Sequence, residues 1–116
     1  MSFGKLASAI LIQDVLTAVY TAPSEAVVGI IITNTNNVPA AFGLSIGPNA
    51  TPQLQDYIEV NSVLGPSINP ITSKYRIEKI PMTAGEIINI MVDTPGVVVR
   101  IHGVDGTDLT AVRYTY

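Results

Sequence analysis

Turn-forming residues interrupt this chain at short intervals along its whole length, and they restrict what it can fold into. The 116 residues include nine glycines and eight prolines, spread from end to end. No long stretch between them repeats its apolar residues with the period of a helix. Short apolar runs bounded by turn signals are typical of all-β sandwiches and barrels. The sequence therefore predicts an all-β protein, an antiparallel β-sandwich of about eight strands, jelly-roll or Ig-like.

The strands are expected where apolar residues alternate or run together between turn signals. These segments are 5–11, 16–21, 25–33, 40–46, 73–80, 86–92, 97–104 and 109–116. Residues 53–60 could be a helical turn or a short strand, since periodicity cannot separate the two over so few residues. They lie in an irregular, proline-rich stretch from 47 to 70, and long loops of this kind are often functional. We expect one sandwich domain over residues 13–116, preceded by an extended N-terminal arm over residues 1–12.

Two of the expected strands are apolar on both faces, whereas a strand on one core should alternate. Residues 26–32 present Val27, Gly29 and Ile31 to one side and Val28, Ile30 and Ile32 to the other. Residues 86–92 are apolar apart from Glu86 and Asn89, and charged residues make up only 13% of the chain, about half the usual share.

Two readings of these apolar faces remain open. Loops such as 47–70 could fold over them within one chain, or a neighbouring subunit could cover them. We favour the neighbouring subunit, which predicts a homo-oligomer. The predicted subunit-interface residues are Val28, Ile30, Ile32, Ile88 and Ile90, with Leu6 and Ile10 from the arm.

Composition argues against several partners. Net charge is −3, and the only grouped cations are Lys74, Arg76 and Lys79, with Glu78 among them. Binding to phosphate backbones needs a dense positive face, so we expect no nucleic-acid partner. The chain has no cysteine, which excludes disulfides and thiolate metal sites. No apolar run reaches the ~18 residues of a membrane span, so we expect no membrane partner.

Catalytic chemistry has little support in the sequence. His102 is the only histidine, and a triad or metal site needs several converging groups. Ser45 lies in G-L-S-I-G, but this motif runs through an alternating strand without the following helix of a nucleophile elbow. Asp105 and Asp108 fit turn chemistry better than a calcium site. We therefore predict no enzyme, and no catalytic, cofactor-binding or metal-binding residue.

A set of segments in fixed order carries a resemblance. The segments are Leu6 to Ile10 (LASAI), Thr17 to Pro23 (TAVYTAP), the apolar strand 26–32, the asparagine turn 34–37, the strand 40–46, Tyr57-Ile58-Glu59, Thr83 to Glu86 (TAGE) and Val97 to Gly103. In this order, over most of residues 6–103, the chain resembles a family of small structural proteins of tailed-bacteriophage virions. The resemblance implies a β-sandwich that works within a symmetric assembly, with copies of itself and other virion proteins as partners.

The function that we predict is that of a virion structural protein, a capsid decoration or cement protein that binds through apolar β faces and its N-terminal arm. The alternative within this class is a neck, tail or baseplate component. From a different class, a glycan-binding surface module remains open, with Tyr57, Tyr75, Tyr114 and Tyr116 as candidates for a sugar platform.

Overall fold

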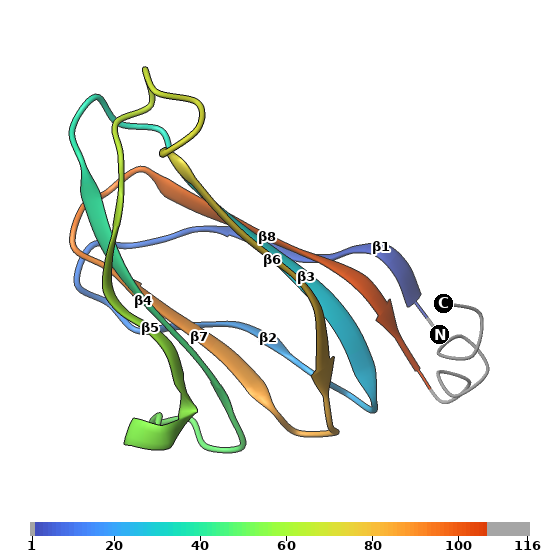
Figure 1. Cartoon of the computed structure of the whole chain (residues 1–116). Coiled ribbons are helices and arrows are strands. Elements are labelled where there is room, and N and C mark those ends of the chain that lie inside the picture. Colours follow the sequence, from blue (N-terminus) through green and yellow to red (C-terminus); the bar gives the residue numbers. More distant parts are fainter. Residues whose placement is uncertain (1, 107–116) are drawn as a thin grey trace.

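Two four-stranded antiparallel sheets pack face to face in the computed structural model, which describes residues 2–106 (Figure 1). Eight strands and one turn of 3-10 helix follow one another along the chain. They are β1 (Ser2–Ile10), β2 (Thr17–Thr21), β3 (Ala26–Asn34), β4 (Ala40–Gly47), η1 (Leu54–Asp56), β5 (Tyr57–Leu64), β6 (Lys74–Met82), β7 (Ile87–Val92) and β8 (Val97–Asp105). The predicted all-β sandwich is confirmed.

The strand order identifies the kind of sandwich. One sheet, which we call sheet A, has the order β1-β8-β3-β6, and the other, sheet B, has the order β2-β7-β4-β5. Between the described strands, every connection except that from β4 to β5 passes from one sheet to the other. This is the winding of a double-sheet jelly roll. Of the two sandwich types that the sequence left open, the structure is the jelly roll.

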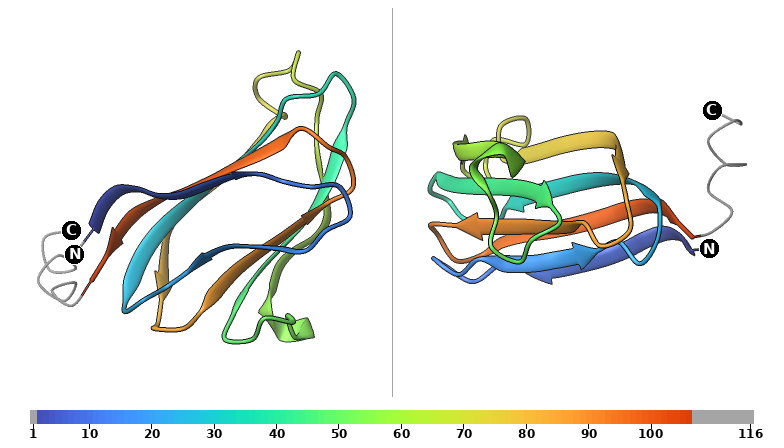
Figure 2. Two further views of the ribbon diagram at one scale, coloured as in Figure 1. Left: turned by 180° about the vertical axis from the view of Figure 1, so that it is seen from behind. Right: turned by 90° about the horizontal axis from the view of Figure 1, so that it is seen from below.

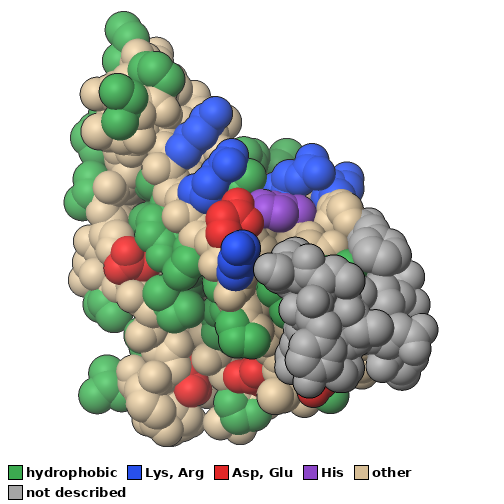
Figure 3. Space-filling view, turned by 45° about the vertical axis from the view of Figure 1, so that its right-hand side comes forward, with side chains coloured by type: hydrophobic (Ala, Val, Ile, Leu, Met, Phe, Trp, Pro, Cys, Tyr) green, Lys and Arg blue, Asp and Glu red, His purple; other side chains and the backbone are tan. Residues whose placement is uncertain are grey.

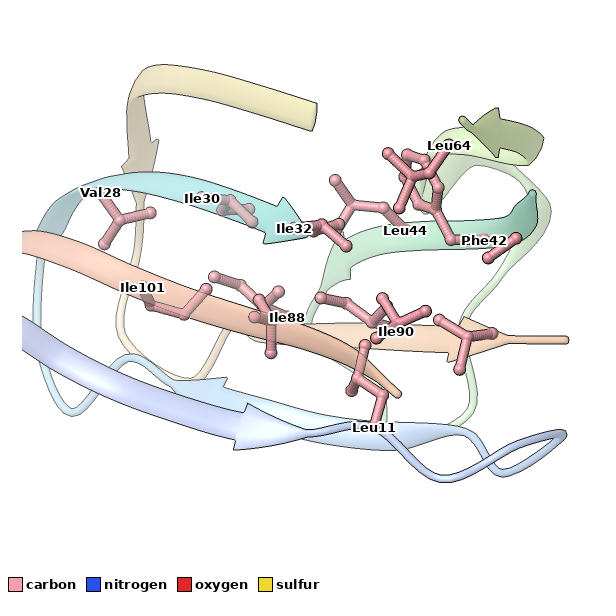
Figure 4. Close-up of a cluster of buried hydrophobic side chains, with 14 of the residues drawn as sticks. Leu11, Val28, Ile30, Ile32, Phe42, Leu44, Leu64, Ile88, Ile90 and Ile101 are labelled. Atoms are coloured by element: carbon pink, nitrogen blue, oxygen red, sulfur yellow. The ribbon is translucent and has the colours of Figure 1, made fainter. Parts of the chain in front are cut away.

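The core fills the space between the two sheets (Figure 4). Strict alternation in β3 sends Val28, Ile30 and Ile32 into it, where they meet Ile88 and Ile90 of β7. All five side chains are essentially inaccessible to solvent, and burying each contributes about 1.5–3 kcal/mol to folding. Their prediction as subunit-interface residues was therefore wrong. The sequence showed two apolar faces on β3, and the one that we assigned to a partner is the one that faces sheet B.

The predicted N-terminal arm is an edge strand of sheet A. β1 pairs with β8 along its whole length, from Ser2 opposite Asp105 to Ile10 opposite Val98. Leu6 packs against the core and Leu11 is fully buried. Residues 2–11 thus belong to the sandwich, because β1 is the strand that hydrogen-bonds to the outer edge of β8. Of the two predicted interface residues in this segment, only Ile10 is widely exposed, at 76%.

Within the irregular stretch 47–70, the sequence left open whether residues 53–60 form a helical turn or a strand, and the structure contains both. A single helical turn, η1, leads directly into the edge strand β5. Asn61 in β5 and Lys79 in β6 have positive φ angles and lie where the register with the neighbouring strand shifts. Bulges of this kind twist an edge strand and discourage pairing with a further strand. The predicted strand 109–116 lies outside the described residues.

Candidate protein-interaction surfaces

The residues that could have supported catalysis are held apart by the fold. His102 faces outward from sheet A, where its Nε2 lies 2.8 Å from Oε2 of Glu78. Ser45 lies on the outward face of sheet B, between the inward-facing Leu44 and Ile46. The two sheets stand between them, so they cannot form a triad. Within residues 2–106, no three His, Cys, Asp or Glu side chains come close enough to hold a metal ion.

The His102–Glu78 pair lies directly over a glycine. The pair joins β8 to β6 across Gly29 of β3, and a Cβ atom at Gly29 would collide with both the carboxylate and the imidazole. Glycine at this position therefore leaves room for the two side chains to meet above β3. Gly29 is also one of the three residues on the second apolar face of β3. As a glycine it has no side chain that would need to be buried.

The outward face of sheet A gathers the cations of the described chain. Lys5 lies beside His102, Lys74 beside Thr33, and Arg76 and Arg100 flank Ile31 from the two neighbouring strands. We call these four residues the basic face. With Lys79, which follows Glu78 on β6, they are all the lysines and arginines in residues 2–106. Figure 3 shows blue side chains gathered around the purple side chain of histidine, which has a red side chain next to it.

An apolar depression lies within the basic face. Ile10, Ile31 and Val98 line it, together with Ser8, Thr33 and Arg100. Ile31 is only partly buried, and Arg76 and Arg100 lie opposite it on the two neighbouring strands; the aliphatic stems of such long side chains can shield an apolar residue. Within residues 2–106, no loop covers the second face of β3 at Ile31, which stays partly exposed. This face offers a surface with an apolar floor and a cationic rim.

The outward face of sheet B carries a groove of opposite charge, which we call the acidic groove. Leu16, Gly43, Leu54, Tyr57, Val60 and Met91 are among its lining residues, with Asp14 and Asp93 beside them. Oδ1 of Asp93 accepts hydrogen bonds from the Ala41 amide, at 2.8 Å, and from the Thr94 hydroxyl. The bond from Ala41 and then that from Thr94 lower the pKa of the Asp93 carboxyl. Asp93 is therefore negatively charged at neutral pH.

An ordered loop carries two isoleucines out into solvent at one end of the sandwich. Ile68 and Ile71 are 85% and 86% exposed, and Val38 of the adjoining turn is also exposed. We call these three residues the apolar tip. The loop that bears the two isoleucines projects beyond the sheets at the top of the left view in Figure 2.

Hydrogen bonds fix the shape of this loop. Gly65 donates to the Thr72 carbonyl and Ser67 to the Asn36 carbonyl. Asn69 Oδ1 accepts from the amides of Ile71 and Thr72. The two isoleucines are therefore held in place rather than left on a free chain.

The tyrosines do not form a platform for sugars among the described residues. Tyr75 packs against Phe42 with ring centroids 5.1 Å apart, and its burial, followed by the charge of Glu59, raises its pKa. Tyr57 lies alone in the acidic groove. Tyr114 and Tyr116 lie outside the described residues.

Comparisons of the chain with protein-family models, with curated proteins and with solved structures find no match. The resemblance to phage virion proteins therefore stays a prediction from the sequence. Among residues 2–106 there is no helix that is long and apolar enough to cross a membrane.

Sequence reasoning missed two of these surfaces. The basic face escaped it because Lys5, Arg76 and Arg100 are far apart in the chain and meet only through the strand order. The apolar tip left a signal that could have been used. Ile68 and Ile71 stand alone among prolines, asparagines and serines, with no strand pattern to take them into a core.

Proposed function

We propose that this protein is a structural component of a bacteriophage virion, a capsid decoration protein that docks on another virion protein and performs no chemistry. The observation that supports the docking role is the apolar tip, where two isoleucines are almost fully exposed on a hydrogen-bonded loop. The assignment to a virion depends on the sequence resemblance.

The tip has the properties of a preorganised anchor. Burying an isoleucine in a partner's pocket contributes about 1.5–3 kcal/mol, and two on one loop could supply a large part of a modest affinity. Since the loop is already held by its own hydrogen bonds, little conformational freedom is lost when it binds. A contact of this kind suits a small protein that occupies many identical sites on a shell.

The first experiment measures how many copies each particle carries. Purified virions are analysed by quantitative mass spectrometry of this chain against the major capsid protein. A copy number comparable with that of the capsid protein is expected for decoration. A number that fits one ring at the neck, tail or baseplate would replace the decoration role with the alternative one, and absence from purified particles would refute the proposal.

The second experiment tests the tip. The double variant Ile68→Ser/Ile71→Ser should fold like the natural protein, because both side chains are in solvent, yet bind particles lacking the natural protein at least tenfold more weakly, a loss of about 1.4 kcal/mol or more. The matched control is Ile12→Ser, which removes another exposed isoleucine from a different part of the surface. Equal binding by both variants would show that the tip is not the docking element.

A further inference from the structure

We propose that copies of this chain bind one another head to tail, with the basic face of one copy on the acidic groove of the next. This inference deepens the proposed structural role by naming a second copy as the partner, and it rests on that role only for its biological use. The contact itself can be tested on the purified protein.

The charges of the two surfaces match. The basic face carries Lys5, Lys74, Arg76 and Arg100, with Glu78 beside them and paired with His102. The acidic groove is lined by Asp14 and Asp93, and no lysine or arginine is among its lining residues in the described chain. Surfaces of opposite sign attract each other and disfavour a contact between like faces. The attraction therefore favours unlike faces of two copies.

The apolar parts of the two surfaces match as well. The floor of the basic face is Ile10, Ile31 and Val98, and the groove presents Leu54, Val60 and Met91. Each set lies beside the charges of its own surface, Arg100 for the floor and Asp14 and Asp93 for the groove, and apolar contacts with polar groups around them are usual in protein interfaces. Pairing the faces would cover Ile10 and Met91, which are both exposed in one copy.

The two surfaces lie on opposite sides of the molecule, because one belongs to sheet A and the other to sheet B (Figure 2). A contact between unlike surfaces leaves one of each free, so it continues into a ring or a filament. A four-stranded sheet face is small beside the roughly 800 Å² per partner of a standard interface. We therefore expect a weak contact in solution, which many copies held on one particle would reinforce through their high local concentration.

The experiment uses two variants, each of which changes the charge of one of the two surfaces so that it can no longer bind. Arg76→Glu/Arg100→Glu reverses the basic face, and Met91→Lys places a cation in the acidic groove. All three residues are exposed, so both variants should melt like the natural protein. In sedimentation velocity at increasing concentration, the natural chain should form dimers and larger species that are lost at high salt. Each variant alone should stay monomeric.

Mixing the two variants gives the decisive result. The intact basic face of Met91→Lys can still bind the intact groove of Arg76→Glu/Arg100→Glu, so an equimolar mixture should form a 1:1 dimer and nothing larger. Ala84→Lys, which adds the same charge in the exposed turn after β6, serves as the control and should associate like the natural chain.

Three results would overturn the proposal. The natural chain could stay monomeric at every concentration, or the mixed variants could fail to form their dimer. In the third result, the natural chain stays monomeric and binds duplex DNA, and the Arg76→Glu/Arg100→Glu variant does not bind it. The basic face would then be a binding site for a polyanion. None of these depends on the copy number in virions, so the two proposals can fail separately.

Discussion

At the scale of single residues, the bond between Tyr20 and Asp105 joins the two sheets. The Tyr20 hydroxyl of β2 donates to Oδ2 of Asp105, the last residue of β8, at 2.6 Å. Asp105 is buried. Burial of Tyr20, then its hydrogen bond to Asp105 and the charge of Asp105, raise the pKa of its hydroxyl above the ordinary 10.0.

Tyr20→Phe should therefore destabilise the fold. The substitution keeps the ring and removes only the donor to a buried carboxylate, a loss that typically costs about 1–3 kcal/mol. Urea unfolding monitored by circular dichroism measures the loss. Tyr57→Phe is the matched control, because Tyr57 is exposed in the acidic groove, and it should change stability by less than about 0.5 kcal/mol. Equal effects of the two variants would contradict this role for Tyr20.

Burial of Tyr20, together with this bond, sets the response to alkaline pH. Because the folded pKa of Tyr20 lies above the unfolded value of 10.0, the unfolded chain loses this proton first. The stabilising effect is complete below pH 10.0 and is lost as the pH rises above it. Tyr75, whose pKa is also raised, acts in the same direction. In Tyr20→Phe, the free energy of unfolding should decline less steeply above this pH than in the natural chain.

At the scale of elements, Asn34 holds together the end of the sandwich that bears the apolar tip. Its Nδ2 donates to the carbonyls of Val38 and Gly65, at 2.8 and 3.0 Å. Its Oδ1 accepts from the backbone and side-chain nitrogens of Asn36. One buried side chain therefore ties the β3–β4 turn to the end of β5, where the tip loop begins.

Asn34→Ala should loosen the tip without removing its isoleucines. It leaves the carbonyls of Val38 and Gly65 without this donor, so we expect a loss of about 1–3 kcal/mol in unfolding free energy. Amide hydrogen exchange should accelerate in residues 65–73 more than in β7. Asn37→Ala, at an exposed position with one long bond of 3.3 Å to Ser67, is the control. Unchanged exchange in the loop would exclude Asn34 as its anchor.

At the scale of the whole molecule, closure of sheet A depends on the N-terminal strand. β1 covers the hydrogen-bonding edge of β8 from Ser2 to Ile10, and Leu11 follows it into the core. An arm that orders only on assembly would be dispensable for folding, whereas this strand is part of the sheet.

Deletion of residues 2–10 should therefore abolish cooperative folding or cause aggregation, because it uncovers the full edge of β8. Thermal unfolding and size-exclusion chromatography measure this. The control is Ile10→Ser, which keeps the backbone pairing, changes only an exposed side chain and should alter stability by less than about 0.5 kcal/mol. A truncated chain that unfolds like the natural protein would restore the arm interpretation.

The sequence by itself determined the class of fold and most of its strands. Alternation between frequent turn residues is a local property, and the buried residues Phe42 and Leu44 of β4, and Val97, Val99 and Ile101 of β8, follow it. The same alternation appears in β6, where Tyr75 and Ile77 lie on the inner side and Lys74, Arg76 and Glu78 on the outer side.

Only the tertiary structure decided which apolar face of β3 is interior and which surfaces remain for partners. Local alternation shows that two faces exist, but the packing of sheet A on sheet B chooses between them, and it took Val28, Ile30 and Ile32. The basic face likewise exists only because β1, β8 and β6, distant in sequence, are placed around β3 in one sheet. Long-range pairing brings such residues together, and no local pattern records it.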